Sequence, residues 1–93
     1  MQQSKSTADT LSNLTGKIAP QAIELEYAVL GGMMIDSRGL DEALMIVRSP
    51  QVFFKEAHQH IFTAIQRLND RGNPVDLLTV STELKAMHKL EEV

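Results

Sequence analysis

The chain lacks cysteine and tryptophan, and it has only one tyrosine and three phenylalanines. The absence of cysteine excludes disulfide bonds and thiolate metal sites. No run of about 18 apolar residues occurs, so no membrane span is expected. The polar N-terminus also lacks the apolar core of a signal peptide. Together these absences favour a soluble, cytoplasmic protein.

Basic residues are scarce as well. Nine Lys and Arg against twelve Asp and Glu give a net charge of −3. A module that grips phosphate backbones carries a basic patch instead, so the composition argues against a nucleic-acid-binding module. The 93 residues, 43% of them hydrophobic, are enough for one small domain with a modest core.

Two regions differ in composition. Residues 1–19 are rich in Ser, Thr, Gln and Asn, and their large apolar residues are few: Leu11, Leu14 and Ile18. Such a segment buries too little surface to offset the entropy of ordering, so we predict a flexible polar tail. Residues 20–93 instead repeat apolar residues at helical spacing without strand-like alternation. The sequence therefore predicts an all-α domain after the tail.

The first predicted helix runs from about Gln21 to Ile35, with Pro20 at its start. It carries two apolar rows: Ile23, Tyr27, Leu30 and Met34, and beside them Leu25, Val29 and Met33. A helix with so little polar surface is either central or partly covered by a partner. Val29 and Met33, on the second row, are therefore candidate protein-interface residues. For Met33 a core position is an equal alternative.

Two adjacent glycines, Gly31 and Gly32, lie inside this helix, and each costs about 1 kcal/mol relative to Ala. The compensation we expect is the close approach of another backbone, which a missing side chain allows. Leucine at either position should then destabilise the fold by a few kcal/mol, on the order of the usual cost of overpacking.

Three further helices are predicted, separated by turns at Asp36–Gly39, Ser49–Pro50 and Asp70–Pro74. They cover about Leu40–Val47, about Pro50 or Lys55 to Asn69, and a segment that begins at the N-cap residue Asp76. The expected buried stripes of the last two are Phe54, Ala57, Ile61, Ile65 and Leu68, and Leu77, Val80, Leu84 and Met87. Ser81, Thr82 and Glu83 should face solvent.

The histidines do not form a convincing metal site. His58 and His60 are two residues apart and point to different sides of a helix, and His88 lies on another helix. We expect one of the first two to be exposed and the other to pack against a neighbouring helix. A metal protein or small helical enzyme using all three remains the alternative.

The carboxylates and arginines have similar interpretations. Glu24 and Glu26 are expected to be charges near a helix N-terminus. Arg67 and Arg71 could contact an anion, although a solvated face is the simpler account. No phosphate-binding loop is present. The sequence predicts no catalytic, cofactor-binding or metal-binding residue.

Three blocks carry a family resemblance. P-Q-A-I-E-L-E-Y-A-V-L-G-G-M-M-I-D resembles the opening segment of replicative DnaB-type DNA helicases, and F-F-K-E-A-H-Q-H-I-F-T-A-I-Q-R-L and G-N-P-V-D-L-L-T-V-S-T-E-L resemble two later blocks. The matching positions in the first two are Pro20, Glu24, Glu26, Val29, Leu30, Gly31, Met34, Asp36, His58, Ile61, Phe62, Ile65 and Leu68. The resemblance covers about Ala19–Val93. Phe53-Phe54 replaces the family's Asp-Phe-Tyr.

The resemblance implies a small orthogonal bundle of about four to five helices, the globular head of a helicase N-terminal domain. The parent would be an ATP- and magnesium-dependent hexameric helicase that unwinds DNA during replication. The domain would pair within the ring, support hexamer assembly and help to recruit primase, with a helicase loader as a further partner. The fragment itself would be non-catalytic, since the ATP site and the main DNA contacts lie in an ATPase domain.

By this resemblance, residues 20–93 are expected to be the domain truncated before its C-terminal helical hairpin. The reason is that the chain stops at Leu90-Glu91-Glu92-Val93. The alternative reading is a stand-alone helical DNA-binding or protein-interaction module. The long third helix and the turn before Asp76 allow it, whereas the acidic composition argues against DNA binding.

Overall fold

The computed structural model describes residues 20–92, and the predicted tail over residues 1–19 lies outside them. The described part is helical and contains no strand, which confirms the predicted all-α fold. Its elements are α2 (Pro20–Ile35), α3 (Ser37–Ile46), the 3-10 turn η1 (Pro50–Val52), α4 (Glu56–Asp70), α5 (Leu77–Ala86) and the 3-10 turn η2 (Leu90–Glu92).

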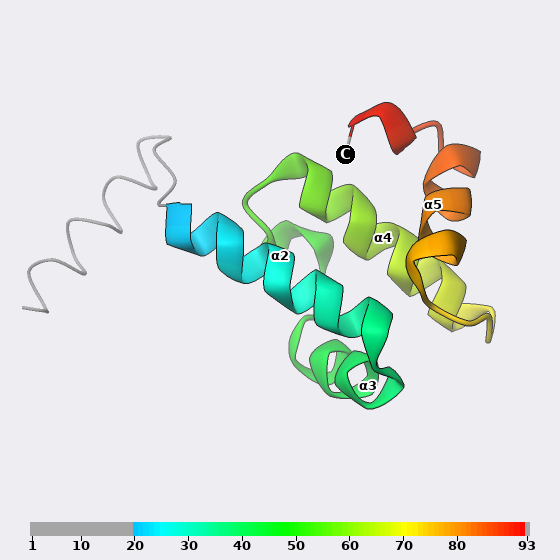
Figure 1. Ribbon diagram of the computed structural model, residues 1–93, viewed down its shortest axis with the longest axis horizontal. Helices are drawn as coiled ribbons and strands as arrows, with labels where there is room; N and C mark the ends of the chain where they lie inside the picture. The colour runs from blue at the N-terminus through cyan, green and yellow to red at the C-terminus, as the bar shows by residue number, and fades with distance from the viewer. Residues whose placement is uncertain (1–19, 93) are drawn as a thin grey trace, which may run out of the picture.

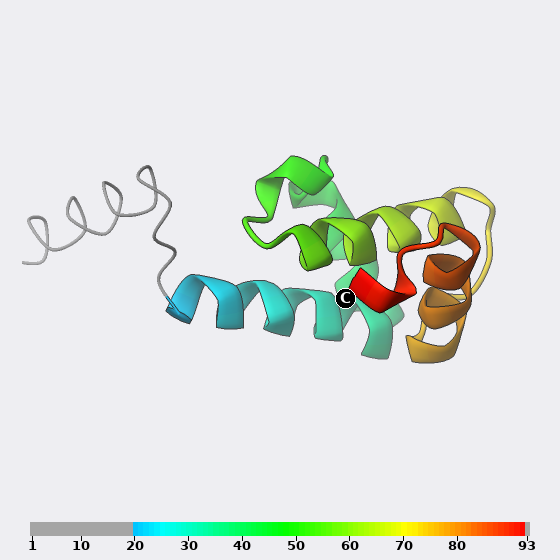
Figure 2. The ribbon, with the colours of Figure 1, turned by 90° about the horizontal axis from the view of Figure 1, so that it is seen from above.

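The helices α2 and α4 lie side by side, as Figures 1 and 2 show from two directions. α3 turns away from the end of α2 and is seen nearly end-on in Figure 1, while α5 packs across the far end of α4. The core fills the space among these helices with Leu30, Met33, Leu40, Phe53, Phe62, Ala64, Ile65, Leu68, Val80 and Leu84. Phe62 and Phe53 contact each other at its centre, with ring centroids 5.3 Å apart.

The predicted turn at Asp36–Gly39 is wrong in extent, because α3 already begins at Ser37. Asp36 alone separates the two helices, with extended backbone angles (φ −132°, ψ 118°). Its carboxylate accepts a 3.0 Å hydrogen bond from the backbone N–H of Arg38. An N-cap bond of this kind satisfies one orphan donor of the first turn, so the second helix starts without a longer loop.

The two predicted rows of α2 are also wrong in detail. The buried residues are Glu26, Leu30 and Met33, whereas Tyr27 is 74% exposed and Leu25 is 66% exposed. The spacing of the buried residues, i, i+4 and i+7, defines one helical face that lies between the two predicted rows. Each predicted row therefore contributes one residue to the core and leaves another at the surface.

The predicted stripe of α4 fails at its first position. Phe54 is 51% exposed, and the neighbouring Phe53 is 3% exposed. The reason is that α4 begins only at Glu56, so helical spacing does not extend back to Phe54. Phe62, which is not part of the predicted stripe, is fully buried.

Candidate functional site

An apolar hollow of about 240 Å³ lies between the first half of α2 and the segment that leads into α4. We call it the α2 hollow; its lining is Ala22, Leu25, Glu26, Val29, Val47, Val52, Phe53 and Phe54. Val29, one of the two predicted interface residues, lies here and is half-buried. Met33, the other, is only 1% exposed, because it faces the core. Its assignment to an interface is therefore corrected to a core position.

Glu26 is one of the residues that line this hollow, and it links α2 to the start of α4. Its Oε2 accepts a 2.6 Å hydrogen bond from the backbone N–H of Phe54. Its Oε1 lies 2.8 Å from His58 Nδ1 and 3.4 Å from the backbone N of Lys55. The carboxylate thus accepts hydrogen bonds at the N-terminal end of α4. Lys55, the N-cap residue of that helix, makes no side-chain capping hydrogen bond of its own. The predicted role of Glu26 as a charge near its own helix terminus is wrong, whereas Glu24 is exposed.

The three histidines have different surroundings. His58 is 4% exposed and contacts the rings of Tyr27 and Phe53, with centroids 6.5 and 6.4 Å away. His60 is half-buried, with its Nε2 3.7 Å from a Glu56 oxygen, so neither of the pair is the exposed histidine that the sequence predicted. Among residues 20–92, no group of three or more His, Cys, Asp or Glu side chains could hold a metal ion.

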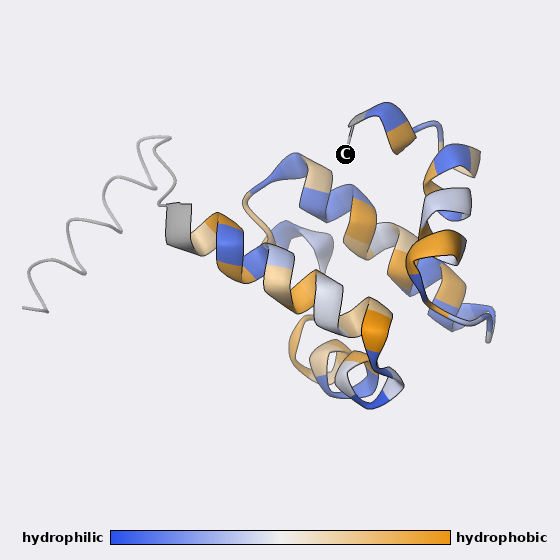
Figure 3. Cartoon of the chain, in the orientation of Figure 1, coloured by the Kyte–Doolittle hydropathy of each residue, from blue (hydrophilic) through white to orange (hydrophobic). Residues whose placement is uncertain are grey.

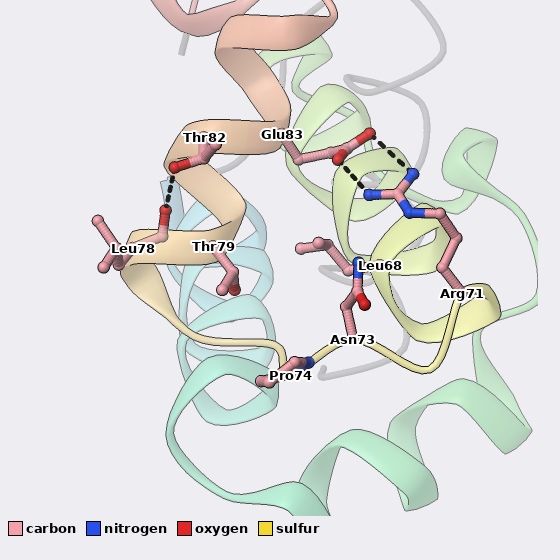
Figure 4. A pocket seen from close by; sticks show the side chains of 8 residues that line it. All are labelled: Leu68, Arg71, Asn73, Pro74, Leu78, Thr79, Thr82 and Glu83. Atoms are coloured by element: carbon pink, nitrogen blue, oxygen red, sulfur yellow. Dashed lines mark hydrogen bonds and ion pairs between the residues drawn. The ribbon is translucent and has the colours of Figure 1, made fainter.

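A second cluster joins the end of α4 to α5. The Arg71 guanidinium donates two hydrogen bonds to the Glu83 carboxylate, from Nη2 to Oε1 at 2.5 Å and from Nη1 to Oε2 at 3.4 Å. Arg67 Nε lies 3.0 Å from Glu83 Oε2. Figure 4 shows the forked contact beside a hollow of about 340 Å³ whose floor includes Leu68. The expectation that Glu83 faces solvent is wrong, since it is 7% exposed.

The contact between Arg71 and Glu83 shifts the pKa of both side chains. The hydrogen bond from Arg71 holds the pKa of the Glu83 carboxyl below its ordinary value of 4.5, although burial acts in the opposite direction. The same hydrogen bond raises the pKa of Arg71. The two arginines therefore serve first as partners of a buried carboxylate, and each remains about half exposed.

Sequence reasoning overlooked both buried glutamates, although a signal existed for each. Glu83 is three residues after Val80 and one before Leu84, on the face that α5 buries. Glu26 is four residues before Leu30 on the buried face of α2. An acidic residue in register with a buried apolar stripe is a candidate for a partnered carboxylate, because an unpaired buried charge is costly.

Several large hydrophobic side chains remain at the surface of residues 20–92. Figure 3 shows hydrophobic colour at the C-terminal end of α2 and on the first turn of α5. The exposed residues are Leu25, Tyr27, Ile35, Met45, Ile46, Val52, Phe54, Leu77, Leu78 and Leu90. Exposed apolar side chains mark an interaction site where they gather in one patch, whereas single ones are common on soluble domains. None of the helices in the described part has the length and apolarity of a membrane span.

Comparison with known proteins gives a consistent result. Residues 18–93 match the family model described as the DnaB-like helicase N terminal domain. The replicative DNA helicase DnaB of Geobacillus stearothermophilus is 49% identical over 77 residues, which cover 83% of this chain and 17% of that protein. The replicative DNA helicase DnaB of Rhodothermus marinus is 45% identical over 82 residues, 88% of this chain and 9% of that protein.

The fold gives independent support. The crystal structure of the N-terminal domain of DnaB helicase from Mycobacterium tuberculosis superposes with a TM-score of 0.70 at 36% sequence identity. The match covers 77% of this chain and 48% of that one. The chain spans less than a fifth of the two curated relatives above, 17% and 9% of their lengths. The chain therefore belongs to the family of DnaB-like helicase N-terminal domains.

Proposed function

We propose that residues 20–93 form the N-terminal scaffolding domain of a replicative DNA helicase, preceded by residues 1–19 as a separate segment. The domain supports assembly of the hexameric ring and recruits primase during DNA replication. It does not itself catalyse a reaction. The parent protein unwinds DNA with ATP and magnesium through an ATPase domain, and a cytoplasmic location accompanies this role.

The observation that carries the proposal is the exposed apolar surface on a domain of this family. Ten large hydrophobic side chains among residues 20–92 are 40% or more exposed, and they include Ile35 at 86% and Ile46 at 80%. Burying an exposed side chain of this size in an interface stabilises an assembly by roughly 1.5–3 kcal/mol. Such surface supports a role in association with other proteins.

The proposal commits to two kinds of contact. One is with a second copy of the domain, through exposed apolar side chains outside the α2 hollow, such as Ile35 and Ile46. The other is with primase, and a helicase loader is a further class of partner. DNA contacts are assigned mainly to the ATPase domain, since this chain carries a net charge of −3.

The proposal is tested with the purified 93-residue chain. We expect light scattering to show a molar mass that rises with concentration, and we expect titration with replicative primase to give saturable binding. ATP hydrolysis should stay at the level of the buffer, with or without single-stranded DNA. Hydrolysis proportional to the amount of chain would contradict the scaffolding role.

A salt-dependent gel shift on duplex DNA would instead favour the alternative, a stand-alone DNA-binding module. A chain that stays monomeric at high concentration and does not bind primase would contradict the proposed partners. The same result would leave the family assignment intact, because that rests on residues 18–93 as a sequence match.

A further inference from the structure

We infer that the α2 hollow is a docking groove for the chain's own N-terminal segment, with Leu11 and Leu14 as the side chains that enter it. This inference is independent of the proposed helicase role. It joins two observations that the role leaves unexplained: an apolar hollow on the described domain, and a polar segment with a few large apolar residues at helical spacing.

The hollow has the chemistry of a groove for aliphatic side chains. Its lining is apolar except for Glu26, whose carboxylate is already bonded to the Phe54 N–H and to His58. Leu25, Val52 and Phe54 on its rim are 66%, 59% and 51% exposed. Its volume of about 240 Å³ lies below the roughly 300–1,000 Å³ of small-molecule pockets. A few apolar side chains of a peptide therefore fit it better than a cofactor does.

The N-terminal segment supplies matching side chains. Leu11, Leu14 and Ile18 follow i, i+3 and i+7 spacing, while the positions between them are polar or glycine. This is the pattern of a peptide that lays one apolar face into a groove. Docking would require the chain to reverse before α2; Gly16 lies in that stretch of the sequence, and glycine tolerates the conformations that a reversal requires.

The distances allow this contact within one molecule. The hollow is lined by the first turns of α2, and Ala22 and Val29 are separated by about 10 Å along the helix axis. Six residue steps lead from Leu14 to Pro20, and they span up to about 20 Å when extended. Leu14 can therefore reach the part of the hollow that α2 lines between Ala22 and Val29. Leu11, three residues further away, reaches it as well.

The tether is the reason to prefer this segment over a second copy. A binding segment joined by a short linker has an effective concentration on the order of millimolar at its own site. A separate copy at micromolar concentration competes poorly with it unless its contacts are far stronger. The tether therefore favours the segment over a second copy as the occupant of the hollow.

The absence of cysteine allows a clean test on the full chain. A nitroxide is attached to Lys55→Cys, next to Phe54 on the rim, or to Lys85→Cys on α5 as the control; both lysines are exposed. We expect the amide signals of residues 11–18 to lose most of their intensity with the first label and little with the second. Equal intensity with both labels would overturn the inference.

Matched variants separate a specific contact from chance proximity. Leu11→Ser with Leu14→Ser should restore the lost signals, as should Leu25→Ser on the rim. Ser12→Ala with Asn13→Ala should leave the loss unchanged. Signal loss that survives the leucine substitutions contradicts the groove. Loss seen only when the nitroxide and the observed nuclei are on different copies assigns the hollow to a second molecule and likewise overturns the inference.

Discussion

Glu26 Oε1 and His58 Nδ1 lie 2.8 Å apart although the two residues are 32 positions apart in the chain. Both side chains are buried, and the carboxylate also accepts the N–H of Phe54. This pair ties α2 to the start of α4, which connects the longest helix of the described part to the core helix beside it. Glu26 also lines the α2 hollow.

We expect Glu26→Ala to lower the free energy of unfolding by about 2–4 kcal/mol, because it leaves the Phe54 N–H and the His58 ring without their acceptor in a buried place. Urea denaturation at pH 7 measures the change. Glu24→Ala is the matched control, since Glu24 is exposed on the same helix. It should change stability by no more than about 0.5 kcal/mol. Equal effects of the two substitutions would contradict the assigned role.

Glu83→Gln should make unfolding less dependent on pH. The folded-state pKa of Glu83 is below its ordinary 4.5, so its contribution is fully present above about that pH and is lost as pH falls through the folded-state value. The wild type should therefore exceed Glu83→Gln in stability at pH 7, and the gap should narrow below pH 4 (roughly the ordinary glutamate range). Urea midpoints at several pH values measure it, and a gap that widens on acidification would be the contrary result.

Gly31→Ala and Gly32→Ala should each stabilise the chain by roughly 0.5–1 kcal/mol, since alanine is the better helix former. A Cβ added at either position meets no atom within 4 Å, so the close backbone crossing predicted from the sequence is wrong. The observation concerns the Cβ alone, so the destabilisation expected for leucine, whose side chain extends further, stays a prediction. Thermal unfolding measures the effect.

Gly39→Ala is the comparison for these two glycines. Its added Cβ would lie 3.4 Å from the Gly32 carbonyl oxygen, where α3 approaches α2. The gain in helix propensity should then be smaller than at Gly31. A destabilised Gly31→Ala variant would show that the surface of α2 is packed in solution in a way that this chain's own helices do not explain.

The C-terminal ends of α4 and α5 have the same backbone geometry. Gly72 (φ 72°) and His88 (φ 62°) occupy the same left-handed position after each helix. In both, the next N–H returns to a carbonyl five residues earlier: Asn73 to Leu68 at 2.9 Å and Lys89 to Leu84 at 2.8 Å. These bonds define a Schellman motif, for which glycine is the preferred residue.

His88→Gly should therefore stabilise the chain by up to about 1 kcal/mol, whereas Gly72→Ala should destabilise it by about 1–2 kcal/mol. Chemical denaturation of the two variants beside the wild type measures both. Changes of the same sign would contradict the shared motif. Neither substitution touches the α2 hollow, so the spin-label experiment remains interpretable in either background.

The prediction from sequence worked best where a local rule decides the structure. Asp76 was expected to start a helix, and it does, through a capping box with Thr79. Gly72 followed by Pro74 was expected to end one, and α4 ends at Asp70. The prediction failed at Phe53 and Phe54, because a helical period says which residues share a face only inside the helix. The position of the first turn of α4 decides which of the two phenylalanines is buried.

The sequence by itself determined the helical class, most helix ends and the family, since these depend on local spacing, capping and ordered motifs. The tertiary structure decided which face of α2 is buried, because three apolar directions compete on that helix and only the position of α4 selects one. The tertiary structure also decided that the side chains of Glu26 and Glu83 are buried. A buried carboxylate is tolerable only beside its donors, and those donors, the Phe54 N–H and the Arg71 guanidinium, come from other parts of the chain.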